Sequence, residues 1–121
     1  MEVQYTSSWY DLTAEGEAAN QLMADGCVII GQHADSTGAP SAVQAKKDAG
    51  EVVYSVGYNI DMLEAAPTAA LTSSQNNWSV LYRDTLEKFL AGEEIPADYS
   101  VGITEDAVMI STLGPECAEG T

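Results

Sequence analysis

The stretch CVIIGQHADSTGAPSAVQAKKDAGEVVYSVGY, residues 27–58, predicts the fold class, because two apolar runs flank one amphipathic segment. Residues 27–31 are apolar throughout, as expected of a strand that is covered on both faces. Residues 39–50 have a proline where a first helical turn tolerates one and a glycine where a helix can end. Residues 52–58 are predicted as the next strand. Strand, helix and strand in this order indicate a parallel sheet with helices on its faces.

The segments on either side extend this alternation. A short strand is predicted over residues 3–6, and a helix over residues 13–26, where small and apolar side chains recur every three or four positions. Residues 76–91 form the most clearly amphipathic segment, with Trp78 on the apolar face and therefore expected in the core. Residues 99–112 are predicted as two short strands around a turn, which would make a C-terminal hairpin. The chain should therefore be a single three-layer α/β domain with a mostly parallel sheet.

The charge balance excludes some classes of partner. The chain has 121 residues, with 4 Lys plus Arg against 19 Asp plus Glu and a net charge of −15. A surface this acidic repels nucleic acid and anionic membranes. No apolar run approaches the roughly 20 residues that a membrane span needs, and no signal peptide is present. A strand directly after Met1 and the abrupt end GPECAEGT predict that the chain is a piece of a longer protein.

Polar and aromatic side chains follow three of the predicted strands. The segment SSWYD follows the first strand, QHADS the second and GYNIDM the third. Parallel strands have their carboxyl ends at one edge of the sheet, and ligands of open α/β sheets bind beyond that edge. The side chains expected to converge there are Trp9, Asp11, His33, Asp35, Asn59 and Asp61.

These residue types suit a small organic ligand better than a metal ion. The indole of Trp9 can stack on a planar base. Asn59 and Asp61 can bond hydroxyl groups or ring nitrogens. His33 is the only histidine, which argues against a metal centre and favours a hydrogen bond at the cleft edge. Asn76, at the start of the long helix, can cap that helix or reach a ligand. No metal and no cofactor are predicted.

Four motifs resemble those of the basic membrane lipoprotein family, in the same order and at similar spacing: YTSSWYD, VIIGQHADS, VGYNIDM and ALTSSQNNWSVLY. Members of this family are substrate-binding proteins of ABC importers, and many bind purine nucleosides or purine bases. The resemblance covers nearly the whole chain. It implies a type I periplasmic-binding-protein fold, in which two Rossmann-like lobes close on the ligand. It also implies that residues 1–121 are the second lobe only.

The resemblance carries further expectations about partners and location. The parent protein should have a first lobe, a signal peptide and a lipidated cysteine upstream, and should deliver its ligand to an ABC permease. It should lie in the periplasm or on the outer face of the cell membrane. Three positions depart from the family pattern: Leu12 replaces a common proline, Asn59 an acidic residue and Asn76 a tryptophan. These departures bear on which ligand is bound.

Two other classes of function stay open at this point. The first is a small enzyme on a flavodoxin-like sheet or a receiver-like domain. The sequence contains no G-x-G-x-x-G, P-loop or G-x-S-x-G motif, and no lysine follows Lys88, as a receiver would require. We therefore predict that the chain is not an enzyme. The second is an interaction module that has lost ligand binding. An exposed cleft edge would also permit self-association.

Overall fold

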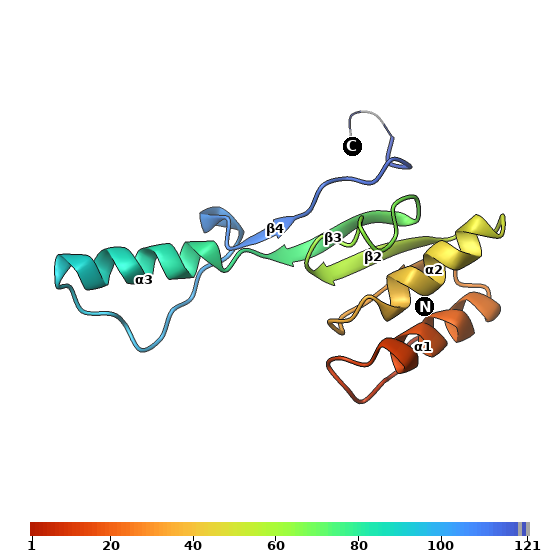
Figure 1. The fold of residues 1–121 in the computed structure, drawn as a ribbon, viewed down its shortest axis with the longest axis horizontal. Helices are drawn as coiled ribbons and strands as arrows, with labels where there is room; N and C mark the ends of the chain where they lie inside the picture. The colour runs from red at the N-terminus through yellow and green to blue at the C-terminus, as the bar shows by residue number, and fades with distance from the viewer. Residues whose placement is uncertain (119, 121) are drawn as a thin grey trace.

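The computed structural model describes residues 1–118 and residue 120. The elements follow in the order α1 (Leu12–Ala24), β1 (Ile29–Gly31), α2 (Gly38–Asp48), β2 (Tyr54–Asn59), β3 (Ala70–Asn76), α3 (Ser79–Ala91), a 3-10 turn (Ile103–Glu105) and β4 (Val108–Ile110). The alternation of helices and strands confirms the predicted α/β class (Figure 1). Within the described residues, no helix is both long enough and apolar enough to cross a membrane.

One four-stranded sheet runs through the molecule in the order β1-β2-β3-β4. β1, β2 and β3 are parallel to one another, with Ile30 of β1 opposite Ser55 of β2. β4 is antiparallel to β3, with Met109 opposite Gln75. The mostly parallel sheet predicted from the sequence is therefore confirmed.

The C-terminal strands differ from the prediction. The two strands expected over residues 99–112 are replaced by the 3-10 turn and β4 alone. The chain does fold back here, because the carbonyl of Gly102 accepts from the N–H groups of Ala107 at 2.9 Å and Val108 at 3.4 Å. However, β4 pairs with β3 rather than with the segment before the turn. The free edge of β3 supplies the main-chain partners that a hairpin would otherwise have supplied.

The strand predicted over residues 3–6 is not part of the sheet. In the described residues the sheet begins with β1. Val3 and Tyr5, the larger apolar side chains of this segment, are both exposed. β1 has only three residues, so its free edge offers few main-chain groups for a further strand. The segment instead forms one wall of a groove, described below.

Helices α1 and α2 lie side by side next to the parallel strands (Figure 1). The start of α2, at Gly38, lies close to the start of α1. A Cβ atom at Gly38 would lie 2.2 Å from the carbonyl oxygen of Leu12, so only glycine permits this approach. The buried core beside these helices is formed by small and medium side chains: Ala19, Met23, Ile30, Ala39, Val43, Val53, Ala66, Ala69 and Ala70.

Helix α3 forms as predicted but does not add a layer to the sheet. It extends away from the end of β3 (Figure 1). None of its residues is buried. Trp78, which was expected in the core, is 57% exposed, and Phe89 on the same helix is 69% exposed. The amphipathic pattern correctly predicted a helix, but the surface that would cover its apolar face is not among residues 1–118.

Candidate functional site

The carboxyl ends of three parallel strands bring the predicted site residues to one edge of the sheet. His33 and Asp35 follow β1, Asn59 is the last residue of β2, and Asn76 is the last residue of β3. Trp9 comes from the loop before α1, whose main chain is bonded to the loop after β1. The topology therefore places together residues that are distant in the sequence.

Three aromatic rings lie next to one another at this edge. The ring centroids of Trp9 and His33 are 5.6 Å apart at an interplanar angle of 66°. The rings of His33 and Tyr58 are 4.5 Å apart at 54°. We call Trp9, His33 and Tyr58 the aromatic row. Trp9 is 67% exposed, so its indole is accessible to a planar ligand.

Three polar side chains form a second line beside the aromatic row. The side-chain amide of Asn59 donates to Oδ1 of Asp35 at 3.5 Å. The side-chain amide of Asn76 donates to Oδ1 of Asn59 at 3.1 Å. We call Asp35, Asn59 and Asn76 the polar row. Asn59 has a φ of 71°, a left-handed conformation in which asparagine is tolerated better than most residues.

The hydrogen bonds within the polar row determine what is left for a ligand. Each amide of the row uses one N–H to reach its neighbour, so its second N–H stays available. Oδ2 of Asp35 and Oδ1 of Asn76 are further acceptors. The row can therefore bind a molecule that offers both hydrogen-bond donors and acceptors along one edge.

Two other predicted residues have different contacts. Oδ1 of Asp61 accepts from the N–H of Leu63 at 2.9 Å, so this carboxylate stabilises the turn after β2. Asp11 caps α1, accepting from the N–H groups of Thr13 and Ala14. The structure places neither residue in the aromatic row or the polar row.

Sequence reasoning did not single out Tyr58, and it placed Asp35 at this edge without giving it a role in ligand binding. Both belong to the motifs that were noticed, GYNIDM and QHADS. Their positions in the sequence could have indicated a role at the site. Tyr58 is the last aromatic residue before the end of β2, and Asp35 follows β1 closely. The rule that residues at the carboxyl ends of parallel strands lie at one edge therefore also applies to these two residues.

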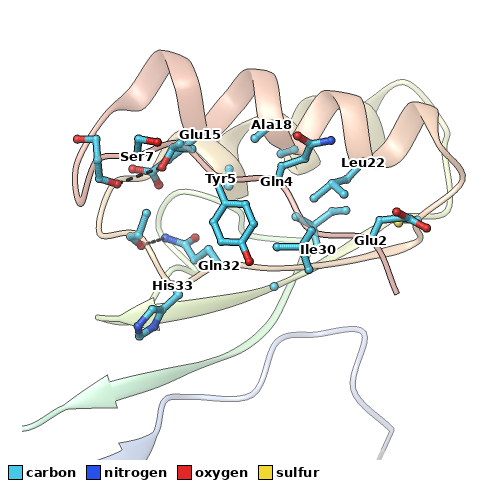
Figure 2. Close-up of a pocket in the computed structure, with 18 of the residues that line it drawn as sticks. Glu2, Gln4, Tyr5, Ser7, Glu15, Ala18, Leu22, Ile30, Gln32 and His33 are labelled. Carbon is cyan, nitrogen blue, oxygen red and sulfur yellow. Dashed lines mark hydrogen bonds between the residues drawn. The ribbon is translucent and has the colours of Figure 1, made fainter.

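A groove of about 790 Å³ opens beside the aromatic row. One wall is the segment 1–9, and the other is made by α1 and β1, including Ala18, Leu22 and Ile30. Figure 2 shows Tyr5 between α1 and the strand, with His33 at one end of the groove. A smaller hollow of about 280 Å³ lies at the other end of the site, between Asn76 and Tyr99.

No lysine or arginine belongs to either row. The chain has four Lys and Arg residues in total. Lys46 pairs with Glu51, Lys47 pairs with Glu116, and Lys88 pairs with Asp84. The hydrogen bond to Asp84 raises the pKa of Lys88, so this ammonium stays charged. With a net charge of −15, the site suits an uncharged ligand better than a phosphorylated one.

Within residues 1–118 and 120, no group of three or more His, Cys, Asp or Glu side chains is arranged to bind a metal ion. The two rows can stack on a ligand and hydrogen-bond to it.

Comparisons with known proteins find a matching family model and two similar proteins. The model of the Bmp family, described as ABC transporter substrate-binding protein PnrA-like, matches residues 1–117. A putative ABC transporter glucose-binding protein, TsgA13, from Haloferax volcanii is 32% identical over 98% of this chain and 29% of that protein. A purine-binding protein from Brucella abortus is 35% identical over 76% of this chain and 25% of that protein. The chain thus spans less than a third of the length of these relatives.

Solved structures have the same fold. A crystal structure of an ABC transporter solute-binding protein from Aeropyrum pernix K1 has a TM-score of 0.79 and 20% identity, over 90% of this chain and 30% of that chain. An ABC transporter solute-binding protein from Conexibacter woesei has a TM-score of 0.69 and 22% identity, over 93% of this chain and 36% of that chain.

Proposed function

Since the chain belongs to the Bmp family of PnrA-like ABC transporter substrate-binding proteins, as its motifs predicted, we propose that it binds an uncharged purine base or nucleoside. It does so as one lobe of a longer receptor that presents its ligand to an ABC permease outside the cytoplasm. The receptor binds and releases the ligand without turnover.

The observation that carries the proposal is the aromatic row beside the polar row. A purine has flat faces for the indole of Trp9 and an edge that alternates donors and acceptors for Asp35, Asn59 and Asn76. The purine-binding relative from Brucella abortus supports this ligand class. The glucose-binding relative makes a hexose the alternative to test, because amides and carboxylates also bind sugar hydroxyls.

The exposed apolar face of α3 supports the assignment as one lobe. A helix with such a face usually packs against another part of the protein. The chain spans 29% of one curated relative and 25% of another, so a parent of that length has ample further sequence. The first lobe of such a parent would cover α3 and the exposed edge that carries Trp9.

One lobe should bind its ligand weakly. A pocket between two lobes encloses about 70–90% of a small ligand, and a single lobe supplies about half of those contacts. A Kd of about 1 μM corresponds to roughly −8 kcal/mol, so halving the interaction leaves binding near 1 mM. We therefore expect the 121-residue chain to fold and to bind purines only at millimolar concentrations.

Nuclear magnetic resonance of the ¹⁵N-labelled chain tests the ligand class at these concentrations. Adenine, adenosine, guanosine and glucose are titrated separately. We expect purines to shift the indole N–H of Trp9 and the side-chain amides of Asn59 and Asn76, with little effect of glucose. If only glucose causes shifts, the ligand is a hexose and not a purine. If no ligand causes a shift, the chain is better described as an interaction module that has lost ligand binding.

A matched pair of variants separates stacking at the site from stacking elsewhere. Both tryptophans are more than half exposed, but only Trp9 belongs to the aromatic row. Trp9→Ala should abolish the purine-induced shifts, and Trp78→Ala should leave them unchanged. Titration calorimetry adds a test of the lobe assignment, because micromolar binding by the monomeric chain would mean that the site is complete without a second lobe. Consumption of any ligand during these titrations would point to an enzyme.

A further inference from the structure

Glu15, in the first turn of α1, joins the two loops that carry the first two rings of the aromatic row. Glu15 is 3% exposed, and its Oε1 accepts from the main-chain N–H of Asp11 at 3.1 Å and of Ser36 at 3.3 Å. Asp11 is the last residue of the loop before α1, which carries Trp9, and Ser36 lies in the loop after β1, which carries His33. One oxygen atom therefore spans two segments that are distant in the sequence.

The two loops have a second connection and a fixed anchor. The N–H of Asp35 donates to the carbonyl of Trp9 at 2.7 Å. Ser36 is fully buried, and its Oγ accepts from the N–H of Gly38 at 3.1 Å, at the start of α2. The loop after β1 is thus attached to α2, and the loop before α1 is positioned relative to it through Glu15.

We propose that Glu15 is a positioning residue, which fixes Trp9 relative to His33 and so sets the geometry of the surface on which the ligand stacks. The inference rests on the proposed function for the identity of the ligand. It assigns a specific role to a residue that does not belong to either row.

The buried state of Glu15 supports this role. Oε2 has no hydrogen-bond partner among the described residues, and Glu15 takes part in none of the ion pairs found there. Burial of a carboxylate without a cation is unfavourable. The two N–H groups that Oε1 accepts account for an acceptor at this position, because each of them belongs to a different loop and would otherwise have no partner among the described residues.

Two substitutions separate positioning from stability. Glu15→Gln keeps an oxygen acceptor at Oε1, and Glu15→Met keeps the length of the side chain without an acceptor. Both are made in a Trp78→Phe background, so that Trp9 is the only tryptophan. Glu17→Met, on the same helix and exposed, is the matched control.

The first readout is the nanosecond decay of Trp9 fluorescence anisotropy without ligand, with the urea midpoint of each variant measured in parallel. We expect Glu15→Met to lower the midpoint, because two N–H groups lose their acceptor, and to increase the fast component even without urea, where the variant is still folded. Glu15→Gln and Glu17→Met should have the anisotropy decay of the parent. If Glu15→Met folds and leaves the decay unchanged, the proposal is wrong.

The second readout is the purine-induced shift of the Trp9 indole N–H. Far below saturation this shift is proportional to the association constant. Loss of positioning equivalent to one hydrogen bond should reduce it about tenfold in Glu15→Met. Because the anisotropy decay needs no ligand, a parent chain that binds no purine would refute the proposed function and leave the positioning role to be decided by anisotropy.

A measurement on the unmodified chain covers the case in which Glu15→Met does not fold. Hydrogen exchange is followed at the main-chain amides of Asp11 and Ser36. Both should be protected to a similar degree, because both donate to the same buried oxygen. If either amide exchanges at the rate of an unprotected loop while the fold is intact, Glu15 does not connect the two loops and the proposal is wrong.

Discussion

Replacing Gly38 with alanine should lower the free energy of unfolding by about 1–3 kcal/mol, because it overpacks the contact between α1 and α2. The added Cβ would lie 2.2 Å from the carbonyl oxygen of Leu12 and 3.0 Å from its carbonyl carbon. Ordinary contact begins at 3.4 Å, and both neighbours are main-chain atoms that no side-chain rotation can move. The two helices would have to separate by about 1 Å, with loss of packing along their contact.

Gly16→Ala is the matched control for this prediction. It lies on α1 at the same contact, but its Cβ would be 3.5 Å from the carbonyl oxygen of Gly38, which is an ordinary distance. Alanine is also the better helix former, so this variant should gain about 0.5–1 kcal/mol.

Urea unfolding followed by far-UV circular dichroism compares the two variants. With a slope of about 1–3 kcal/mol per molar urea, the expected changes move the midpoint in opposite directions by measurable amounts. An unchanged or higher midpoint for Gly38→Ala would mean that α1 and α2 do not approach as described. A loss of stability in Gly16→Ala equal to that in Gly38→Ala would refute the argument from distance.

Three further predictions concern single side chains. Asp11→Ala removes the N-cap of α1 and should cost about 1 kcal/mol in urea unfolding, whereas Asp11→Asn should cost much less. Met62 is 1% exposed, so Met62→Ala should cost about 2–5 kcal/mol, visible as a lower Tm; a change below 1 kcal/mol would place Met62 outside the core. Asn59→Gly suits the φ of 71° but removes the acceptor for Asn76, so stability should change little while the purine-induced shift of the Asn76 amide is lost. If the shift is retained, the side chain of Asn59 is not needed for ligand binding.

The parts of the fold that were predicted correctly are those marked by apolar runs. β1 and β2 lie within runs of Val, Ile and Tyr, and α2 has its proline in the first turn and ends shortly before its glycine. The expectation that the first of these strands is covered on both faces was wrong, because Ile29 of β1 is 56% exposed. β3 was missed because its sequence, ALTSSQN, is mostly small and polar. Ser73 is nevertheless buried there, because its N–H donates to Oγ of Ser111 at 2.9 Å and its own Oγ accepts from the N–H of Met62. Side-chain hydrogen bonds of this kind leave no trace in a hydropathy pattern.

The site was predictable to the extent that topology determines it. The rule that parallel strands share a carboxyl edge was enough to choose His33, Asp35 and Asn59 as neighbours. Trp9 was chosen through a strand over residues 3–6 that does not form, and Asn76, which was expected at the start of the long helix, is the last residue of β3. The rule could not distinguish a carboxylate that stabilises a turn, as Asp61 does, from one that faces a ligand. Such choices depend on local turn geometry and on which amide reaches which oxygen, and neither is fixed by residue type.

The absence of buried residues in α3 has a consequence for how the chain unfolds. An isolated helix of 13 residues is marginal in water, and packing normally supplies the rest of its stability. We therefore expect one cooperative unit in the 121-residue chain, made of the sheet with α1 and α2, and a helix α3 that frays independently of it. The amides of α3 should exchange by local fraying, at rates that do not depend on the global free energy of unfolding. A melting temperature measured on this chain would therefore describe only the sheet with α1 and α2.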